Sequence, residues 1–279
     1  FKLRGAGNAI KSLIASENND LRSQGVFTCS AGNFAQGLAY NCKQLQVPCT
    51  IVVPDNAPQV KVAAIKRHGA TVVKAPYDTW WNVMKTHQYE DLHGTFVHPV
   101  CNRDVIAGNG TIGLEIAEEL DKVDVVISPF GGGGLSTGIG SAMKALRPDS
   151  KLYVCEVETA APLSTSFAAG QPSHVVNHKT SFVDGMGGKS VFPEMWPLAR
   201  NLIEDSLILS LESVAEAVRL LVERCHIVAE GAGAAPVAAA LGWHKNELID
   251  LKNKNIVCVV SGGNIDSQVL AKILGGETP

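Results

Sequence analysis

The chain has 279 residues, of which 46% are hydrophobic and 18% charged, and its formal net charge is −3. These values are typical of a globular protein with one large domain or two smaller ones. The sequence contains no basic run and no interleaving of basic with aromatic residues, so we expect no nucleic-acid partner. No apolar stretch reaches the roughly 18 residues of a membrane-spanning helix, and no signal-peptide pattern opens the chain. We therefore expect a cytoplasmic protein without a membrane partner.

Strand-like and helix-like segments alternate along the first hundred residues. The predicted strands are 26–29, 48–53, 70–74 and 95–97, and the predicted helices are 9–15, 34–44, 57–68 and 79–89. Such alternation is typical of a parallel sheet with crossover helices. The sequence therefore predicts an α/β fold.

The second half continues in the same style. It contains predicted strands at 123–128, 152–156, 207–211 and 256–260, and predicted helices at 113–120, 139–146, 212–225 and 230–240. Residues 159–194 lack a strong period and contain several glycines and prolines, so we interpret them as an ordered excursion over a site. We expect two α/β units, with the chain passing between them near residues 25–30 and again near 100–105.

Seven cysteines are spread over the chain without a CxxC pair. They are Cys29, Cys42, Cys49, Cys101, Cys155, Cys225 and Cys258. Most lie beside apolar, strand-like residues, which indicates buried free thiols in a reducing compartment rather than metal ligands.

A run of glycines separates the predicted strand 123–128 from the helix that follows it. Gly131, Gly132, Gly133 and Gly134 allow bare backbone N–H groups to surround an anion, and the helix N-terminus adds its positive end. The run predicts a phosphate cradle; the alternative is a sharp, tightly packed turn. It is not a Walker loop, because no Lys-Ser/Thr follows the glycines, and its spacing does not fit a dinucleotide fingerprint.

Two further glycine-containing turns follow predicted strands, at 30–33 and 261–264. In open α/β sheets, ligands gather beyond the carboxyl ends of the strands. Taken alone, Lys2 is a surface lysine and Asn33 a turn or helix-cap residue. The set of motif matches described next makes them candidate site residues.

Five motifs together resemble the threonine dehydratase and serine racemase family of fold-type-II pyridoxal phosphate enzymes, whose fold is like that of the tryptophan synthase β subunit. They are Phe1-Lys2-Leu3-Arg4-Gly5-Ala6, Ser30-Ala31-Gly32-Asn33-Phe34-Ala35-Gln36, the glycine run up to Leu135, Glu230-Gly231-Ala232-Gly233-Ala234 and Ser261-Gly262-Gly263-Asn264. The first matches the family's Ser-Phe-Lys-x-Arg-Gly-Ala from the Phe onward. Because this chain begins at that Phe, either it has been cut or a preceding segment has been left out.

The resemblance implies the cofactor pyridoxal 5′-phosphate and a role for each motif. Lys2 is expected to form the Schiff base and to act as the base at Cα, while Phe1 packs on the ring. Asn33 is expected to bind the ring hydroxyl oxygen and Ser261 the pyridine nitrogen. The phosphate is assigned to Gly131, Gly132, Gly133, Gly134 and Leu135.

The expected substrate residues are Ser30, Ala31, Gly32, Asn33, Phe34 and Asp184. Ser30 and the loop N–H groups lie at a helix start, which suits a substrate carboxylate. For Asp184, a turn residue before glycine is the alternative reading. Glu230 either caps its own helix or tunes the site, and the sequence does not decide between these roles.

The resemblance implies β-elimination of water from a β-hydroxy α-amino acid, which gives a 2-oxo acid and ammonia. A serine at the pyridine nitrogen favours this reaction, because a hydroxyl does not hold the nitrogen protonated and the ring is then a weaker electron sink. The alternatives are an amino-acid racemase, a β-replacement synthase and a non-catalytic amino-acid-binding subunit. Racemases of the family resemble Ser-Ser-Gly-Asn in the loop, where this chain has Ala31, which cannot transfer a proton.

Two other positions depart from the family. The residue after the loop asparagine is usually His and is here Phe34, which is either a packing change or an apolar wall for a bulky β-substituent such as the phenyl group of phenylserine. The divalent-metal site of some members matches at Glu156 and at the carbonyl of Ala160, but its aspartate position is Pro162. We therefore expect no metal.

The resemblance also implies a large and a small domain. We assign residues 1–28 and 105–279 to the large, cofactor-binding domain and residues 29–104 to the small one. We expect a homodimer or a higher homo-oligomer.

Overall fold

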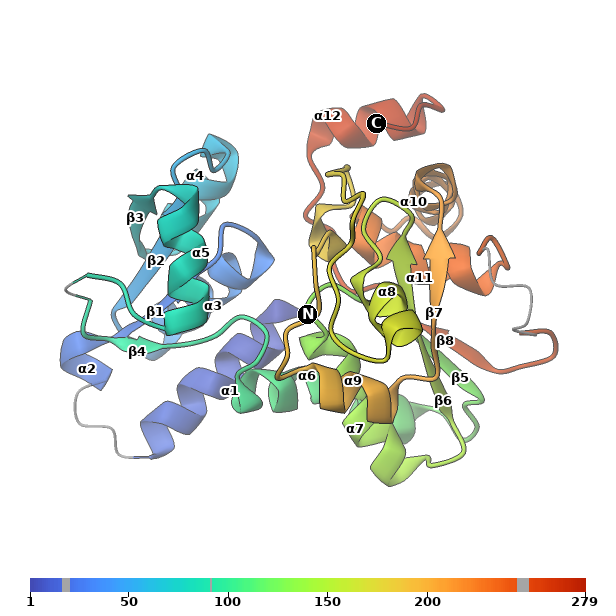
Figure 1. Ribbon diagram of the computed structural model, residues 1–279, viewed down its shortest axis with the longest axis horizontal. Coiled ribbons are helices and arrows are strands. Elements are labelled where there is room, and N and C mark those ends of the chain that lie inside the picture. Colours follow the sequence, from blue (N-terminus) through green and yellow to red (C-terminus); the bar gives the residue numbers. More distant parts are fainter. Residues whose placement is uncertain (17–20, 91, 245–250) are drawn as a thin grey trace. The chain divides into compact units, whose positions relative to one another are not determined.

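The computed structural model describes residues 1–16, 21–90, 92–244 and 251–279 (Figure 1). Tertiary contacts divide the chain into two compact units, Phe1–Asn109 (unit 1) and Gly110–Pro279 (unit 2). The predicted assignment of residues 1–28 to a large domain stays a prediction.

Unit 1 contains a parallel sheet with the strand order β3-β2-β1-β4. Its strands are β1 (Val26–Cys29), β2 (Cys49–Pro54), β3 (Thr71–Ala75) and β4 (Thr95–Phe96). β1 is buried along its whole length, as expected for a central strand covered on both faces.

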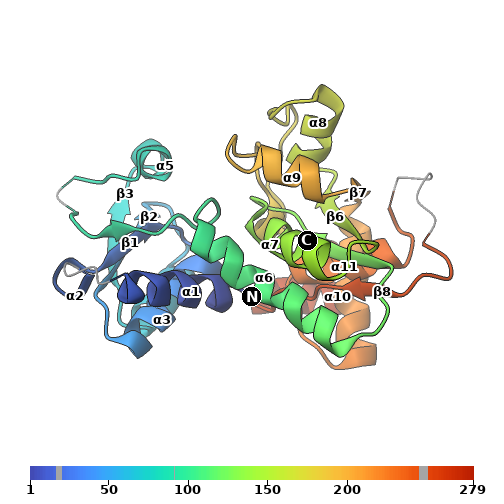
Figure 2. The same ribbon diagram turned by 90° about the horizontal axis from the view of Figure 1, so that it is seen from below.

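Helices cover both faces of this sheet. They are α1 (Lys2–Ala15), α2 (Leu21–Gln24), α3 (Asn33–Leu45), α4 (Gln59–Arg67) and α5 (Tyr77–Thr86). In Figure 2, α1 and α3 lie on one side of the sheet and α5 on the other. α1 and α3 approach closely because Gly37 has no side chain: a Cβ there would lie 3.1 Å from the carbonyl carbon of Lys2. The long helix α6 (Arg103–Glu119) carries the boundary between the units.

Unit 2 contains a second parallel sheet, with the order β7-β6-β5-β8. The strands are β5 (Val125–Pro129), β6 (Lys151–Val157), β7 (Asp205–Leu209) and β8 (Ile256–Cys258). β5 is buried throughout, which matches its apolar sequence and its central place.

Seven short elements surround the sheet of unit 2 in the described residues. They are α7 (Gly134–Leu146), α8 (Pro162–Ala169), η1 (Asp184–Met186), α9 (Trp196–Leu202), α10 (Leu211–Cys225), α11 (Gly231–Ala240) and α12 (Ser267–Leu274). The main core joins one face of the strands to α10 and α11, through residues such as Ile127, Cys155 and Leu207. α7 packs on the opposite face, where a Cβ at Gly140 would lie 2.8 Å from the Leu152 side chain.

The structure confirms the predicted α/β fold with two sets of parallel strands. Several boundaries were wrong. α1 begins at Lys2 instead of residue 9, α6 begins at Arg103 instead of 113, and β7 lies two residues earlier than predicted. The excursion 159–194 contains α8 and η1, and α9 and α12 were not predicted. These helices are one to two turns long, too short for a hydrophobic period to identify.

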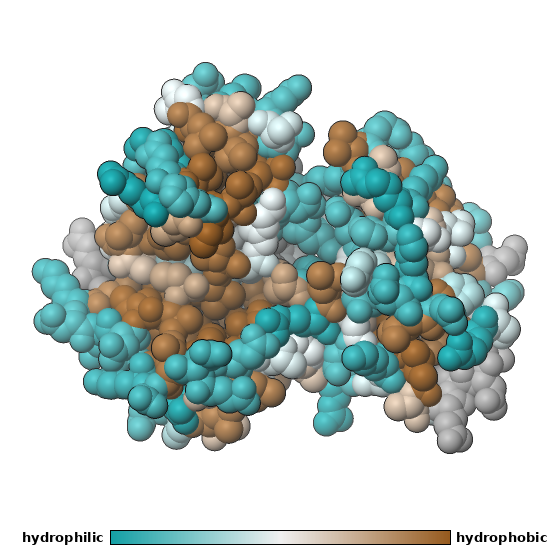
Figure 3. Space-filling view, turned by 180° about the vertical axis from the view of Figure 1, so that it is seen from behind, coloured by the Kyte–Doolittle hydropathy of each residue, from teal (hydrophilic) through white to brown (hydrophobic). Residues whose placement is uncertain are grey.

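Apolar side chains also reach the surface of unit 2. Exposed examples are Ile227 and Val228, which follow α10, and Val260, which follows β8. Figure 3 shows a broad apolar area over this unit, at the left of the view. Among the described helices, none combines the length and the apolar character needed to cross a bilayer.

Candidate functional site

Lys2 lies in the first turn of α1, half-buried between two aromatic rings of unit 1. Its Nζ atom is 4.8 Å from the centroid of the Phe1 ring and 5.7 Å from that of Phe34. Both distances fit an amino group above an aromatic face. A neutral primary amine carries a lone pair, which makes it both a nucleophile and a proton acceptor. Lys2 is therefore placed to act as a nucleophile and as a base.

His98 is a titratable residue of unit 1 that is influenced by the charge of Lys2 and to which the sequence assigned no role. It is 6% exposed, and its Nδ1 accepts hydrogen bonds from the backbone N–H of Val100 at 3.0 Å and of Cys101 at 2.8 Å. Because Nδ1 is an acceptor, the neutral ring carries its proton on Nε2. Burial, together with the nearby charges of His87 and Lys2, lowers the pKa of His98 to about 4. His98 thus stays neutral near pH 7 and adds no second cation beside Lys2.

The asparagine loop joins β1 to α3, so its residues stand at the carboxyl edge of the sheet in unit 1. Gly32 is the N-cap of α3 and provides no side-chain cap, while its own N–H donates to Oγ of Ser30 at 3.3 Å. Asn33 is the first residue of the helix and, like Ala31, is half-buried. This 13-residue helix presents its first N–H groups at the loop, an arrangement that favours an anion.

Phe34 belongs to the hydrophobic core of unit 1 and is only 2% exposed. The same ring lies near Nζ of Lys2. Phe34 was interpreted either as a packing change or as an apolar wall. The two interpretations are compatible, because one side chain both fills the core and presents an apolar surface toward Lys2.

The glycine run of unit 2 connects β5 to α7. Gly133 is the N-cap of α7 with a φ of 93°, a conformation that favours glycine. A Cβ there would lie 3.1 Å from the Phe130 ring, and one at Gly131 would lie 3.0 Å from the carbonyl oxygen of Gly185. A side chain at either position would press on these neighbours, so the loop keeps a bare backbone. Bare backbone N–H groups at the N-terminus of α7 fit a phosphate group. Leu135, in the first turn of α7, is buried.

Ser261 follows β8 and is 6% exposed, at the edge of the sheet where the glycine run also lies. β8 is the direct neighbour of β5, so both turns leave carboxyl ends of adjacent strands. The carbonyl oxygen of Gly262, the next residue, accepts a hydrogen bond from the backbone N–H of Glu230 at 3.0 Å.

Asp184 begins the short helix η1, and its side chain is exposed. The segment that it opens packs on the glycine run, because the carbonyl of Gly185 lies against Gly131. Asp184 thus stands on a segment next to the glycine run, and its role at a substrate stays a prediction.

The carboxylate of Glu156 is hydrogen-bonded within unit 2. Its carboxylate accepts hydrogen bonds from the backbone N–H of Leu163 at 2.8 Å, from that of Ser164 at 2.9 Å and from Oγ of Ser206 at 2.6 Å. Burial raises its pKa to about 7, while the three hydrogen bonds act in the opposite direction. It caps α8, whose first residue is Pro162. No group of three metal-ligating side chains occurs among the residues that the structure describes.

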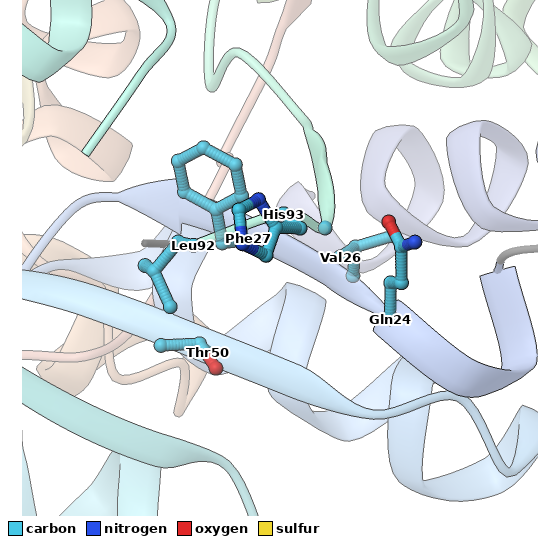
Figure 4. A pocket seen from close by; sticks show the side chains of 7 residues that line it. Gln24, Val26, Phe27, Thr50, Leu92 and His93 are labelled. Atoms are coloured by element: carbon cyan, nitrogen blue, oxygen red, sulfur yellow. The ribbon is translucent and has the colours of Figure 1, made fainter. Parts of the chain in front are cut away.

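The structure gathers the predicted residues into two sets, one in each unit. The set of unit 1 contains Phe1, Lys2, Phe34 and the asparagine loop. The set of unit 2 contains the glycine run and Ser261, with the segment of Asp184 against the glycines. A surface pocket elsewhere in unit 1 lies near the beginnings of β1 and β2 and is lined by Val26, Thr50 and five neighbours (Figure 4). It contains none of the predicted residues.

Comparison with known proteins gives concordant findings. Residues 1–262 match the family described as "Pyridoxal-phosphate dependent enzyme". The chain is 37% identical over 276 residues to an L-threonine ammonia-lyase of Thermotoga maritima, covering 98% of this chain and 66% of that protein. It thus spans just under two thirds of that relative.

Two solved structures share the fold. Threonine deaminase isoform 2 of Solanum lycopersicum, in its processed form, is 31% identical with a TM-score of 0.87, covering 98% of this chain and 78% of that chain. Serine racemase of Dictyostelium discoideum is 34% identical with a TM-score of 0.84, covering 95% of this chain and 83% of that chain. These likenesses confirm the predicted resemblance and its cofactor: the chain belongs to the family of pyridoxal-phosphate-dependent enzymes.

Proposed function

We propose that this protein dehydrates and deaminates β-hydroxy α-amino acids, such as L-threonine, L-serine or phenylserine, to a 2-oxo acid and ammonia. The environment of Lys2 carries this proposal. Its amine lies 4.8 Å from the centroid of the Phe1 ring and 5.7 Å from that of Phe34, in a position where a primary amine can serve as nucleophile and as base. The similarity to an L-threonine ammonia-lyase supports the same reaction.

The two residue sets divide the work of binding. Gly131 to Gly134 hold the phosphate through backbone N–H groups, and Leu135 closes that end. Asn33 and Ser261 bind the polar atoms of the ring, and Phe1 packs on its face. The bound pyridoxal phosphate supplies the electron sink that makes the Cα–H bond of the substrate acidic.

The remaining residues act on the substrate itself. Ser30 and the N–H groups through Asn33 bind its carboxylate at the start of α3. Lys2 removes the proton from Cα, and this proton and the β-hydroxyl are together lost as one molecule of water. A second water molecule then hydrolyses the imine form of the released product to the 2-oxo acid and ammonia. Phe34 faces the β-substituent with an apolar ring, and Asp184 orients the substrate from unit 2.

Racemisation needs a second proton donor on the ring face opposite Lys2. The family's racemases resemble Ser-Ser-Gly-Asn in this loop, but this chain has Ala31, whose methyl group has no proton to give. Elimination is therefore the favoured outcome, even though a serine racemase shares the fold. We further propose that the enzyme acts in the cytoplasm as a homodimer or higher homo-oligomer.

The test is an incubation of the cofactor-loaded protein with L-threonine, L-serine and L-threo-phenylserine in separate reactions. Both 2-oxo acid and D-enantiomer are measured in each tube, and Lys2→Ala is the control for chemistry without the enzyme. We expect 2-oxo acid and ammonia in equal amounts with little D-enantiomer. D-enantiomer in excess of 2-oxo acid would assign a racemase, and the absence of both products would refute catalysis on this substrate class.

A further inference from the structure

Glu230 precedes α11 in the position where a side chain often caps a helix. It is the N-cap residue of α11, yet its carboxylate makes no capping hydrogen bond. The residue is 6% exposed, so its carboxylate is held inside unit 2. Of the two roles that the sequence left open, the structure does not show the side-chain helix cap.

The carboxylate lies between two glycines that belong to different site segments. A Cβ built on Gly262, in the loop that follows Ser261, would lie 2.7 Å from Oε1 of Glu230 and 3.2 Å from its Cδ. A Cβ on Gly185, in the segment that begins at Asp184, would lie 3.4 Å from the same Oε1. A Cβ on Gly262 would therefore overlap the Glu230 carboxylate. At Gly185 the nearest atom is Cβ of Ala232, at 2.8 Å, and the Glu230 oxygen lies at ordinary contact distance.

The backbone of Glu230 contacts the same loop. Its N–H donates to the carbonyl oxygen of Gly262 at 3.0 Å. The segment at Gly185 in turn touches the glycine run, since its carbonyl lies 3.0 Å from a Cβ built on Gly131. One buried residue therefore lies between the loop that presents Ser261 and the segment that covers the phosphate loop.

We propose that Glu230 is a positioning residue, which wedges between Gly262 and Gly185 and so fixes the Ser261 hydroxyl and the glycine run in the arrangement that binds the cofactor. This inference rests on the proposed function, because it assigns Ser261 to the cofactor ring. Glu230 acts through the two glycines and does not itself touch the reacting atoms. Its fit explains the absence of a side chain at Gly262, whereas at Gly185 the Cβ of Ala232 also excludes one.

The proposed contact between Glu230 and Gly262 is tested by combining a larger residue at one position with a smaller one at the other. Gly262→Ala alone forces a methyl group against the Glu230 carboxylate, and Glu230→Ala removes that carboxylate. We expect each single variant to weaken cofactor binding by about tenfold, because small displacements of positioning groups have effects of this size. In the double variant the new methyl group fills the vacated space, so affinity returns toward that of the parent protein.

Gly263→Ala is the matched control in the neighbouring position. A Cβ on Gly263 meets the backbone carbonyl oxygen of Val228, which Glu230→Ala does not remove. We therefore expect no rescue when Glu230→Ala is combined with Gly263→Ala. Equal rescue of both glycine variants, or rescue of neither, would overturn the wedge.

A second readout separates positioning of Ser261 from general stability. The dissociation constant of pyridoxal phosphate and the visible spectrum of the bound cofactor are measured for Glu230→Ala in the parent and in a Ser261→Ala background. We expect the spectral change to disappear when Ser261 is already absent, and Glu230→Gln, which keeps the size, to bind nearly as the parent does. A Gln variant as weak as Ala, or an undiminished effect without Ser261, would refute the proposal.

The parent protein distinguishes failure of this inference from failure of the proposed function. If the parent binds the cofactor and eliminates water from the substrate while the Glu230 variants behave like it, only the wedge is refuted. If the parent binds no cofactor, the proposed function is refuted and the wedge with it.

Discussion

The two units contribute to the candidate site in different ways. Unit 1 offers reactive side chains: Lys2, Ser30 and Asn33 stand at or just before helix starts, and Phe34 supplies an apolar ring. Unit 2 offers mostly backbone, because Gly131 to Gly134 carry no side chains and Ser261 is flanked by Gly262. Residue chemistry should therefore decide function in unit 1, whereas the absence of a Cβ should decide it in unit 2.

The difference between the two units follows from the chemistry of the groups that they bind, a substrate Cα–H in unit 1 and a phosphate in unit 2. A proton acceptor at Cα has to be a titratable side chain, and only its surroundings can adjust its proton affinity. A phosphate is best held by several N–H groups at once, which requires that nothing but backbone approaches it.

Removal of the amine in unit 1 should have the largest effect. Lys2→Ala should lower kcat by about 10³-fold or more, because both a nucleophile and a base are lost. Lys2 is only half-buried, so the variant should fold normally. Lys11→Ala, an exposed lysine of the same helix, is the matched control and should retain activity. Comparable kcat values for the two variants would contradict a chemical role for Lys2.

The neutral histidine beside Lys2 predicts a pH dependence of stability. Burial lowers the pKa of His98 from its ordinary value of 6.5 to about 4 in the folded protein. Its contribution is complete above pH 6.5 and is lost as the pH falls toward 4, because the unfolded chain then binds a proton that the folded protein excludes. Lowering the pH from 7.5 to 5 should remove about 2 kcal/mol from the free energy of unfolding through this residue.

Urea unfolding of the parent and of His98→Asn at the two pH values isolates this contribution. The Asn side-chain oxygen replaces Nδ1 as acceptor for Val100 and Cys101 but does not titrate. The loss of stability on acidification should be smaller in the variant. The same loss in both proteins would show that His98 is not held neutral.

A methyl group in the glycine run should weaken cofactor binding without touching a reactive side chain. Gly133→Ala combines a φ of 93° with a Cβ 3.1 Å from the Phe130 ring. We expect the dissociation constant of pyridoxal phosphate to rise about tenfold, which corresponds to about 1.4 kcal/mol. Titration of the cofactor-free protein measures it.

Gly170→Ala controls for backbone strain. Gly170 ends α8 with a φ of 68°, and a Cβ there would meet nothing within 4 Å. Both variants should lose about 1 kcal/mol of stability, because Ala is strained at positive φ. Only Gly133→Ala should lose cofactor affinity. Equal affinities for the two variants would refute the phosphate assignment.

Phe34 should have the smallest effect, and it should concern selectivity. An apolar ring beside Lys2 accommodates a phenyl group better than a polar side chain does, so phenylserine should be preferred to serine. Phe34→His should reduce the ratio of their kcat/KM values by about tenfold, the usual range for a few apolar contacts. A parent that turns over phenylserine no better than serine, or a ratio unchanged in the variant, would make Phe34 a packing residue only.

The sequence allowed the sheets and the glycine turns to be predicted because their signals are local. Buried strands such as 125–129 are short apolar runs. Four consecutive glycines, Gly131 to Gly134, show directly that this segment has no side chains. The start of α1 at Lys2 was missed because its first turn, Lys2 to Gly5, shows no apolar period. The short helices α8, α9 and α12 contain too few turns to show one.

Contacts between distant segments could not be predicted in the same way. His98 is 96 residues from Lys2, and no pattern around the His-Pro pair indicates that the ring is buried beside an amine. Glu230 was recognised as ambiguous, and only the folded backbone shows that its carboxylate turns from α11 toward Gly262. Likewise, Glu156 was compared with a metal ligand, whereas its three hydrogen bonds place it as the cap of α8.

The central claim is that Lys2 carries the cofactor, and reductive trapping tests it most directly. The protein is incubated with pyridoxal phosphate, reduced with borohydride, digested and analysed by mass spectrometry. We predict a single pyridoxyl group on the peptide that contains Lys2 and its loss in Lys2→Ala. Reduction onto another lysine in the parent protein, or no stable pyridoxyl adduct at all, would contradict the account.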